Sequence, residues 1–378
     1  MAVVTACHNA RCPAVWLTPD DGRGILSAMV VEQRGKDGET IRAVGMLSGG
    51  LDSILAVRVM LEQGVAVTPL YVSTGLTYAR RNRLIGSSPA SPSRPERAAH
   101  ALGLELVTVE AFEAYIPVIL NPRHGYGSAM NPCVDCRIFM LRQAKRWIEQ
   151  HDHDFVFTGE VLGQRPNSQM RPSLDVVQRE SGLGGLLLRP LSARLLEPTI
   201  PEKCGWVDRE ELYGFHGRSR KPQMALARRF GITDYPQPAG GSCFLVDKHY
   251  AGRLQDFLEH EGAEALSSQR AFLLSLGRHV RLPSGRKVIV GRRKEENAYI
   301  ATQQDQGVLL TTIDEAGPTS LVTGVPTEEE VEQAASITAR YAGIRGDQSV
   351  RVEVRSNGSE EILTVTPLPL DEIHALMV

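Results

Sequence analysis

Residues 41–72 carry apolar positions first in strand-like and then in helix-like spacing. Ile41–Val44 is a short apolar run typical of a strand. Ile54–Leu61 has the spacing of an amphipathic helix, which Gly64 closes, and Val65–Val72 is a second apolar run. Two buried strands around one helix within about thirty residues predict a parallel βαβ unit.

Further apolar runs extend this pattern. We expect strands at 104–109, 155–158 and 184–189, and helices at 96–102 and 136–150. The stretch 80–95 is rich in Arg, Ser and Pro and predicts a mobile loop. Alternation of strands and helices predicts an α/β fold, in which a parallel sheet carries helices on both faces.

The pattern changes after Tyr250. Two apolar runs, 278–282 and 287–292, flank turn residues and predict a hairpin. A helix at 327–341 and a second strand pair, 350–354 and 362–365, complete a smaller α+β domain. We therefore expect an N-terminal extension at 1–40, a first domain at 41–247 and an accessory domain at 248–378.

Composition narrows the class of protein. The 378 residues suffice for two domains, and the formal net charge of −2 gives no global basic field, so any RNA contact must come from local patches. No segment approaches the roughly 18 uninterrupted apolar residues of a membrane span, and the N-terminus lacks the pattern of a signal peptide. We expect a cytoplasmic protein, whose six cysteines are too sparse for a disulfide framework.

The segment between the first predicted strand and helix is suited to an anion. Two adjacent glycines, Gly49 and Gly50, let the backbone approach a ligand closely, and Ser48 and Ser53 add hydroxyls beside unpaired helical N–H groups. The Lys-Ser or Lys-Thr of the other common phosphate loop is absent. We expect a phosphate site here, against the alternative of a glycine-rich turn that binds nothing.

Neighbouring strand ends supply the other candidate nucleotide contacts, because ligands of parallel sheets lie at the carboxyl ends of the strands. Asp52 is expected to position metal or water, although a residue at that place can simply cap a helix. The full set of expected cofactor-binding residues is Gly45, Leu47, Ser48, Gly49, Gly50, Asp52, Ser53, Tyr71, Val72, Ser73, Gly159 and Gln164.

Three cysteines are candidates for a reactive or metal-binding site. Cys133 and Cys136 open a predicted helix, whose N-terminus favours thiolate. Such a pair can bind metal, act as a dithiol or simply pack. Cys243 lies in a Gly/Pro-rich loop, and three thiolates would leave one iron of a 4Fe-4S cluster without a protein ligand. Cys7, Cys12 and Cys204 are expected to lie elsewhere.

Two basic clusters are candidate phosphate contacts. Arg80, Arg81 and Arg83 form either a solvated face or a local hold on phosphate. The second cluster, which precedes a helix expected at 224–230, consists of Arg218, Arg220 and Lys221, and could position a nucleic-acid backbone without reading its sequence.

The segment Ser48–Ser53 resembles the SGGxDS signature of the PP-loop ATP pyrophosphatases. Thr158–Gln164, followed by Asn167–Gln169, and then Leu188–Leu191 are similar to loops of tRNA 4-thiouridine synthetases in that superfamily. The resemblance covers residues 41–247. It implies ATP and Mg²⁺ as cofactors, adenylation of a uridine carbonyl oxygen of tRNA, and displacement of AMP by sulfur.

The cysteine arrangement resembles that of the iron-sulfur-dependent tRNA thiouridine synthetases. The resemblance makes Cys133, Cys136 and Cys243 cluster ligands and, with Asp52, catalytic residues. A zinc site, or thiol exchange without metal as in the 2-thiouridylases, are the alternatives. Within 248–378, Val290–Arg292 with Glu296 and Asn297 faintly resembles the RNA-binding domain of NFACT proteins.

These features predict a tRNA sulfurtransferase whose partners are tRNA and an unidentified sulfur donor, and a homodimer is left open. One alternative is a PP-loop ligase or amidotransferase that delivers nitrogen, which would have no use for three cysteines. Another is a non-catalytic RNA-binding protein with a nucleotide-binding fold, against which the intact Ser48–Ser53 signature argues.

Overall fold

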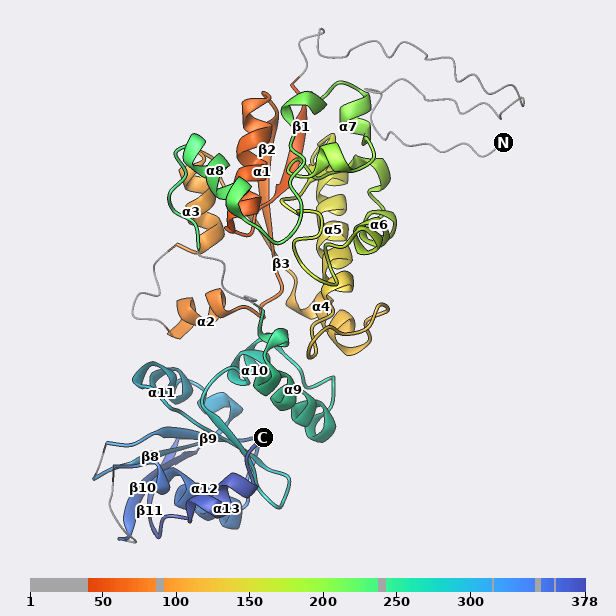
Figure 1. Cartoon of the computed structure of the whole chain (residues 1–378). Coiled ribbons are helices and arrows are strands. Elements are labelled where there is room, and N and C mark those ends of the chain that lie inside the picture. The colour runs from red at the N-terminus through yellow and green to blue at the C-terminus, as the bar shows by residue number, and fades with distance from the viewer. Residues whose placement is uncertain (1–39, 86–91, 237–242, 315, 344–347, 357) are drawn as a thin grey trace.

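A parallel five-stranded sheet forms the centre of the first half of the chain (Figure 1). The computed structural model describes residues 40–85, 92–236, 243–314, 316–343, 348–356 and 358–378. Strand order is β3-β2-β1-β4-β5, and every adjacent pair is parallel. The strands are β1 (Arg42–Met46), β2 (Ala66–Ser73), β3 (Val107–Glu110), β4 (Phe155–Phe157) and β5 (Leu187–Leu188). The expected parallel sheet is confirmed.

Helices cover both faces of this sheet, as expected. Alternate β1 residues point to opposite faces, so Ala43 and Val44 belong to two separate hydrophobic clusters. One cluster holds α4, α5 and α6, and the other holds α1, α3 and α8. The helices are α1 (Leu51–Glu62), α2 (Tyr78–Ile85), α3 (Arg94–Ala101), α4 (Phe112–Leu120), α5 (Cys133–Gln150), α6 (Arg171–Glu180), α7 (Ile200–Lys203) and α8 (Lys221–Arg229).

Two expectations for this half are wrong in part. The stretch expected as a mobile loop contains α2, which packs against α11 of the second domain. Helix α5 begins at Cys133 rather than Cys136, and α8 begins three residues earlier than expected. In both of these helices Pro occupies a position at or next to the first turn, where its missing N–H costs nothing.

The second half contains an antiparallel six-stranded sheet in the order β11-β10-β8-β9-β7-β6. Its strands are β6 (Arg278–Arg281), β7 (Lys287–Val290), β8 (Gly307–Thr312), β9 (Thr319–Thr323), β10 (Val350–Ser356) and β11 (Ser359–Val365). Both expected hairpins, β6–β7 and β10–β11, are present. The helices are α9 (Lys248–Glu261), α10 (Ser268–Leu273), α11 (Lys294–Ala301), α12 (Glu328–Arg340) and α13 (Leu370–Ala375).

Helices α9 and α10 lie between the two sheets (Figure 1). Tyr250, Leu254 and Phe257 of α9 belong to a cluster of the parallel sheet, whereas Phe272 and Leu273 of α10 join the antiparallel sheet. Short 3₁₀ turns complete the chain: η1 (Gly184–Leu186), η2 (Ala193–Leu195), η3 (Arg209–Glu211), η4 (Phe244–Val246) and η5 (Gln304–Gln306). Among the described helices, none is both long and apolar enough to cross a membrane.

Candidate active site

The turn between β1 and α1 depends on its glycines. Gly49 has φ +72°, and a Cβ there would lie 2.6 Å from the backbone carbonyl carbon of Arg94. A Cβ on Gly159, which follows β4, would overlap the carbonyl oxygen of Asp52. Larger residues would therefore push the turn away from both neighbours. The close approach fixes the turn at the carboxyl edge of the sheet.

Hydroxyls and N–H groups face one another within this turn. Ser53 Oγ donates to the Gly50 carbonyl over 2.8 Å and lies 3.3 Å from both the Ser48 amide nitrogen and Ser48 Oγ. Helix α1 starts at Leu51, and its N-cap, Gly50, provides no side-chain cap. The first-turn N–H groups of α1 are thus suited to an anion such as phosphate, and we refer to Ser48–Ser53 as the phosphate turn.

Asp52 is held by side chains from two later segments rather than acting as a helix cap. Gln164 Nε2 donates to Asp52 Oδ2 over 2.7 Å, and Gln223 Nε2 donates to Gln164 Oε1 over 2.9 Å. Arg220 Nη2 lies 3.5 Å from the same Asp52 oxygen. Among the described residues, the buried Oδ1 of Asp52 has no hydrogen-bond partner. An oriented carboxylate with one free oxygen fits a hard cation such as Mg²⁺.

The loop after β4 is fixed by a buried ion pair. Glu160 and Arg189 are each 2% exposed, and Arg189 Nε lies 3.0 Å from Glu160 Oε2. Burial alone would raise the pKa of Glu160, but Arg189 and Arg137 outweigh burial and hold that pKa below its ordinary value. The loop that carries Gly159 and Gln164 therefore starts from a rigid, charged anchor.

Two arginines that the sequence did not single out, Arg137 and Arg165, lie in this region. Arg165 remains in contact with solvent, yet its pKa is lowered, first by desolvation of its guanidinium and then by the charge of Arg137. Asp52 and Cys133 oppose this shift and Arg220 adds to it, so all five groups lie within electrostatic reach of one another. Three arginine side chains, Arg137, Arg165 and Arg220, are therefore near both the phosphate turn and the Cys133–Cys136 pair.

The three candidate cysteines come from two segments. Cys133 and Cys136 occupy the first turn of α5, where Asn131 Nδ2 lies 3.1 Å from Cys133 Sγ. Because α5 leads into the parallel strand β4, its N-terminus lies at the carboxyl edge of the sheet. Cys243 reaches this edge by pairing with Thr77 just after β2, and the next amide, Phe244 N, donates to the Leu76 carbonyl over 2.9 Å.

Cys136 and Cys243 pack against the same hydrophobic cluster. Desolvation raises the pKa of Cys243 to about 12, and the charges of Cys136 and Cys133 add to that rise. Burial also raises the pKa of Cys136, against a hydrogen bond from Tyr115 that lowers it. Within the described part of the chain, no three Cys, His, Asp or Glu side chains meet the geometry of a metal site. The free thiols of Cys133, Cys136 and Cys243 nevertheless have the chemistry of a set that a cation would complete.

Some of the remaining residues expected to bind the nucleotide are buried, so that only their backbone atoms could contact it. Leu47 and Val72 are buried in the hydrophobic clusters, so only their backbone could meet a nucleotide. Ser73 is buried at the end of β2, Tyr71 is partly exposed, and a Cβ on Gly45 would lie 2.5 Å from the Phe157 ring.

The other expected residues are placed as follows. Arg80 and Arg81 do not form a solvated face, because they bond to Ser268 and Glu296 of later segments. Cys204 is buried on the opposite face of the sheet from the candidate cysteines, and Cys7 and Cys12 lie outside the described residues.

A parallel sheet with this strand order, helices on both faces and a Ser-Gly-Gly turn after its central strand defines an open α/β fold, in which ligands lie at the carboxyl ends of the strands. Residues 38–194 match the family described as "Thiamine biosynthesis protein (ThiI)", and residues 277–377 match the "NFACT protein RNA binding domain". The chain thus resembles the ThiI family over residues 38–194 and the NFACT RNA-binding family over residues 277–377. Both resemblances drawn from the sequence are confirmed.

One curated relative and two solved structures extend this comparison. The chain is 26% identical over 286 residues to the tRNA-specific 2-thiouridylase MnmA of Thermobifida fusca (strain YX), covering 68% of this chain and 74% of that protein. The U34-tRNA thiolase NcsA from Methanococcus maripaludis with its [4Fe-4S] cluster is 19% identical, with a TM-score of 0.31 over 62% of this chain and 72% of that one. A 4-thiouridine synthetase–RNA complex with bound ATP is 17% identical, with a TM-score of 0.31 over 50% and 51%. Because both TM-scores are 0.31, these structures support no argument about the site, and its description rests on the geometry of this chain.

Proposed function

We propose that this protein is an ATP-dependent tRNA uridine sulfurtransferase. The observation that carries the proposal is that the phosphate turn, Asp52 and three cysteine thiols all lie at one edge of the parallel sheet. A uridine carbonyl oxygen attacks the α-phosphate of ATP and pyrophosphate leaves. Sulfur then attacks the activated carbon and AMP leaves. This edge offers groups for both halves of that reaction.

The first half requires charge stabilisation on the leaving pyrophosphate. The α1 N–H groups and the Ser48 and Ser53 hydroxyls would hold the phosphates, and Arg137, Arg165 and Arg220 would offset their charge. Asp52 would hold Mg²⁺ through its free oxygen, and the ion would supply neutralisation of the phosphate oxygens. Gln164 and Gln223 would keep that carboxylate in orientation.

The second half requires a sulfur source beside the activated uridine. Cys133, Cys136 and Cys243 would hold a 4Fe-4S cluster, which would supply an iron position without a protein ligand. Tyr115 and Asn131 would hold the sulfurs of Cys136 and Cys133 in place by hydrogen bonds. Zinc, or thiol exchange through the same cysteines, are the alternatives that metal analysis distinguishes. A tRNA substrate and reduced thiols suit the cytoplasm, where a donor must resupply sulfur.

The decisive experiment is nucleoside mass spectrometry of tRNA from cells that lack the gene, with and without a plasmid copy. We expect one thiolated uridine to disappear and to return with the wild-type copy but not with an Asp52→Asn copy. Loss of a nitrogen-containing modification instead would support the rival PP-loop ligase. An unchanged set of nucleosides would contradict the proposed function.

A further inference from the structure

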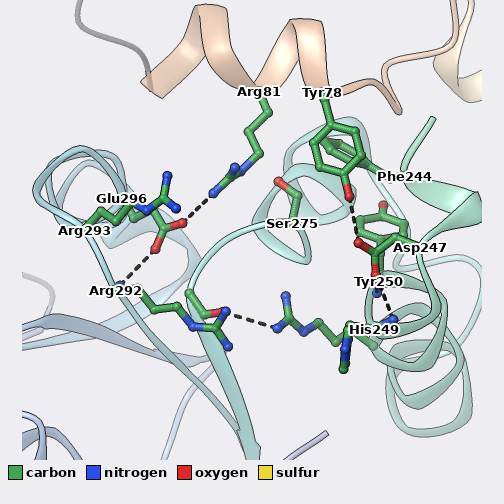
Figure 2. A pocket seen from close by; sticks show the side chains of 12 residues that line it. Tyr78, Arg81, Phe244, Asp247, His249, Tyr250, Ser275, Arg292, Arg293 and Glu296 are labelled. Atoms are coloured by element: carbon green, nitrogen blue, oxygen red, sulfur yellow. Dashed lines mark hydrogen bonds and ion pairs between the residues drawn. The ribbon is translucent and has the colours of Figure 1, made fainter. Parts of the chain in front are cut away.

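A cavity of about 310 Å³ lies where the two halves of the chain meet (Figure 2). Its walls come from α2, from η4 and α9, from the segment between α10 and β6, and from residues 292–296 around the start of α11. This volume is at the lower end of the range of about 300 to 1,000 Å³ for small-ligand pockets. The charged residues that line it are Arg81, Asp247, Arg253, Arg292, Arg293 and Glu296.

Both carboxylates of the cavity are already committed. Asp247 accepts the Tyr78 hydroxyl over 2.8 Å and caps α9 by accepting two backbone N–H groups. Glu296 accepts hydrogen bonds from Arg81 Nη2 over 2.5 Å and from the Arg292 backbone amide over 2.9 Å (Figure 2). Neither acid is therefore free to neutralise the remaining arginines.

The arginines retain unused donors. Arg253 is 8% exposed and donates to the carbonyls of Leu274 and Gly277, but its buried Nε has no partner among the described residues. Arg81 Nε is buried and unpartnered in the same way. The guanidinium groups of Arg292 and Arg293 have no hydrogen-bond or ion-pair partner in the described part of the chain. Four arginines thus surround a space with donors left over for an anion.

Like charges in this cavity also act on one another. Burial lowers the pKa of Arg253, and Arg292 lowers it further. Burial likewise lowers the pKa of Arg292, and Arg278 is the next cause. An anion among these groups would relieve this repulsion.

The cavity adjoins the cysteine site. Phe244, which lines the cavity, directly follows Cys243, and its ring centroid lies 4.8 Å from that of Tyr78 and 5.0 Å from that of Tyr250, which also line the cavity. Arg292 and Arg293 belong to residues 277–377, which match the RNA-binding family. Arg81 belongs to residues 38–194, which match the ThiI family. A ligand in the cavity would contact both parts.

We propose that this cavity binds a backbone phosphate of the RNA substrate and thereby holds the RNA across both domains beside the cysteine site. The claim that the ligand is RNA rests on the proposed function. The claim that the cavity binds an anion rests on its arginines alone. A phosphate with its adjoining sugar is the RNA element that an arginine-lined space of this size would take, because arginine pairs with phosphate through paired N–H donors.

The test is the salt dependence of binding between the full-length protein and an unmodified tRNA transcript. Arg292→Gln combined with Arg293→Gln removes two guanidinium groups that make no structural hydrogen bond or ion pair with the described residues. We expect weaker binding and a log–log salt slope shallower by about 0.7 to 0.9 for each phosphate that the variant no longer neutralises. Arg351→Gln is the matched control, because that exposed arginine pairs with Asp314 elsewhere in the second domain. It should leave the slope unchanged.

An unchanged slope in the double variant would overturn the proposal. A thermal shift with inorganic phosphate that the double variant no longer shows, together with an unchanged RNA slope, would also overturn it and assign the cavity to a small free phosphate ligand. A reduced slope would support the proposal even if the wild-type protein thiolated no tRNA, and that result would contradict the proposed function alone.

Discussion

The two carboxylate oxygens of Asp52 have different surroundings. One carboxylate oxygen is held by Gln164 and approached by Arg220, and the other is buried without a partner among the described residues. Asp52→Asn preserves size and removes the charge, so we expect ATP-dependent pyrophosphate release to fall about 100-fold or more. A coupled pyrophosphate assay with tRNA present measures this change.

The control for that experiment is Asp175→Asn on α6, where the carboxylate is 60% exposed and far from the turn in sequence. Its pyrophosphate release should match the wild type. Both variants should keep the wild-type melting temperature. Normal release by Asp52→Asn would remove Asp52 from the nucleotide site.

Gly159 tests the close approach between the β4 loop and the phosphate turn. A methyl group there overlaps the Asp52 carbonyl, so Gly159→Ala should lower the free energy of unfolding by about 1 to 3 kcal/mol and weaken ATP binding. Gly252 in α9 has open space around its Cβ position, and Gly252→Ala should raise stability by about 1 kcal/mol. Denaturant unfolding measures the stability of each variant, and calorimetric titration measures its affinity for ATP. Equal effects of the two substitutions would contradict a steric role of the close approach between Gly159 and Asp52.

Residues of the site were predictable where they form contiguous motifs. Ser48–Ser53 and the Cys133–Cys136 pair each combine chemistry with a helix start inside a few residues. Arg137 and Arg165 carry no such spacing, because their role depends on how α5 and the β4 loop meet in three dimensions. Single arginines in a sequence do not reveal which groups they will face.

At the scale of elements, the start of α5 and the turn η4 together determine what the cysteines can bind. Anaerobically purified protein should contain about four irons per chain, and Cys136→Ala should lose them together with tRNA thiolation. Val134→Ala, in the same helical turn, should keep the metal. Iron, zinc and acid-labile sulfide analysis measures the outcome, and one zinc without sulfide would replace the cluster with a zinc site.

Strands β6 and β7 meet α9 around a buried lysine, which predicts a pH effect on stability. Burial lowers the pKa of Lys287 to about 8, although its ion pair with Asp256 opposes the shift. Because this pKa is about 10.5 in the unfolded chain, the unfolded state holds the proton more tightly. The contribution of Lys287 to the free energy of unfolding therefore rises between about pH 8 and pH 10.5.

Lys287→Met isolates this contribution, because Arg281 remains bound to Asp256 at 2.5 Å. Denaturant unfolding of both proteins gives their free energies of unfolding across that pH range. The value for the wild type minus the value for Lys287→Met should increase as the pH rises. A difference that does not change with pH would mean that the lysine titrates normally in the folded protein.

Elements with strong apolar periodicity were predictable, and those stabilised by partners were not. The β1–α1–β2 unit, α12 and both hairpins follow from local patterns. Helix α2 is rich in arginine and is stabilised through the later segments that receive Arg80 and Arg81. Strands β8 and β9 were not expected. They are central strands that pair with each other and, on their outer sides, with β10 and β7, so their formation depends on contacts across the sheet.

At the scale of the whole molecule, α9 and α10 connect two hydrophobic cores. We propose that the first structural unit extends to about residue 276, because α9 packs on the parallel sheet and the RNA-binding family match begins at residue 277. A chain that ends at 276 should stay folded and keep ATP binding. A chain that ends at 247 should lack Tyr250, Leu254 and Phe257 in its core and unfold, and circular dichroism with thermal melting measures both.

The pairing of Cys243 with Thr77 has a consequence for how the protein is made. Cys133 and Cys136 arise within one helical turn, whereas Cys243 is added 107 residues after Cys136, by subtraction of their positions. At about 5 to 20 residues per second, the third thiol leaves the ribosome roughly 5 to 20 s after the pair. During that interval the nascent chain holds two thiols of an unfinished set. A metal centre held by all three cysteines would therefore load only after Cys243 has left the ribosome.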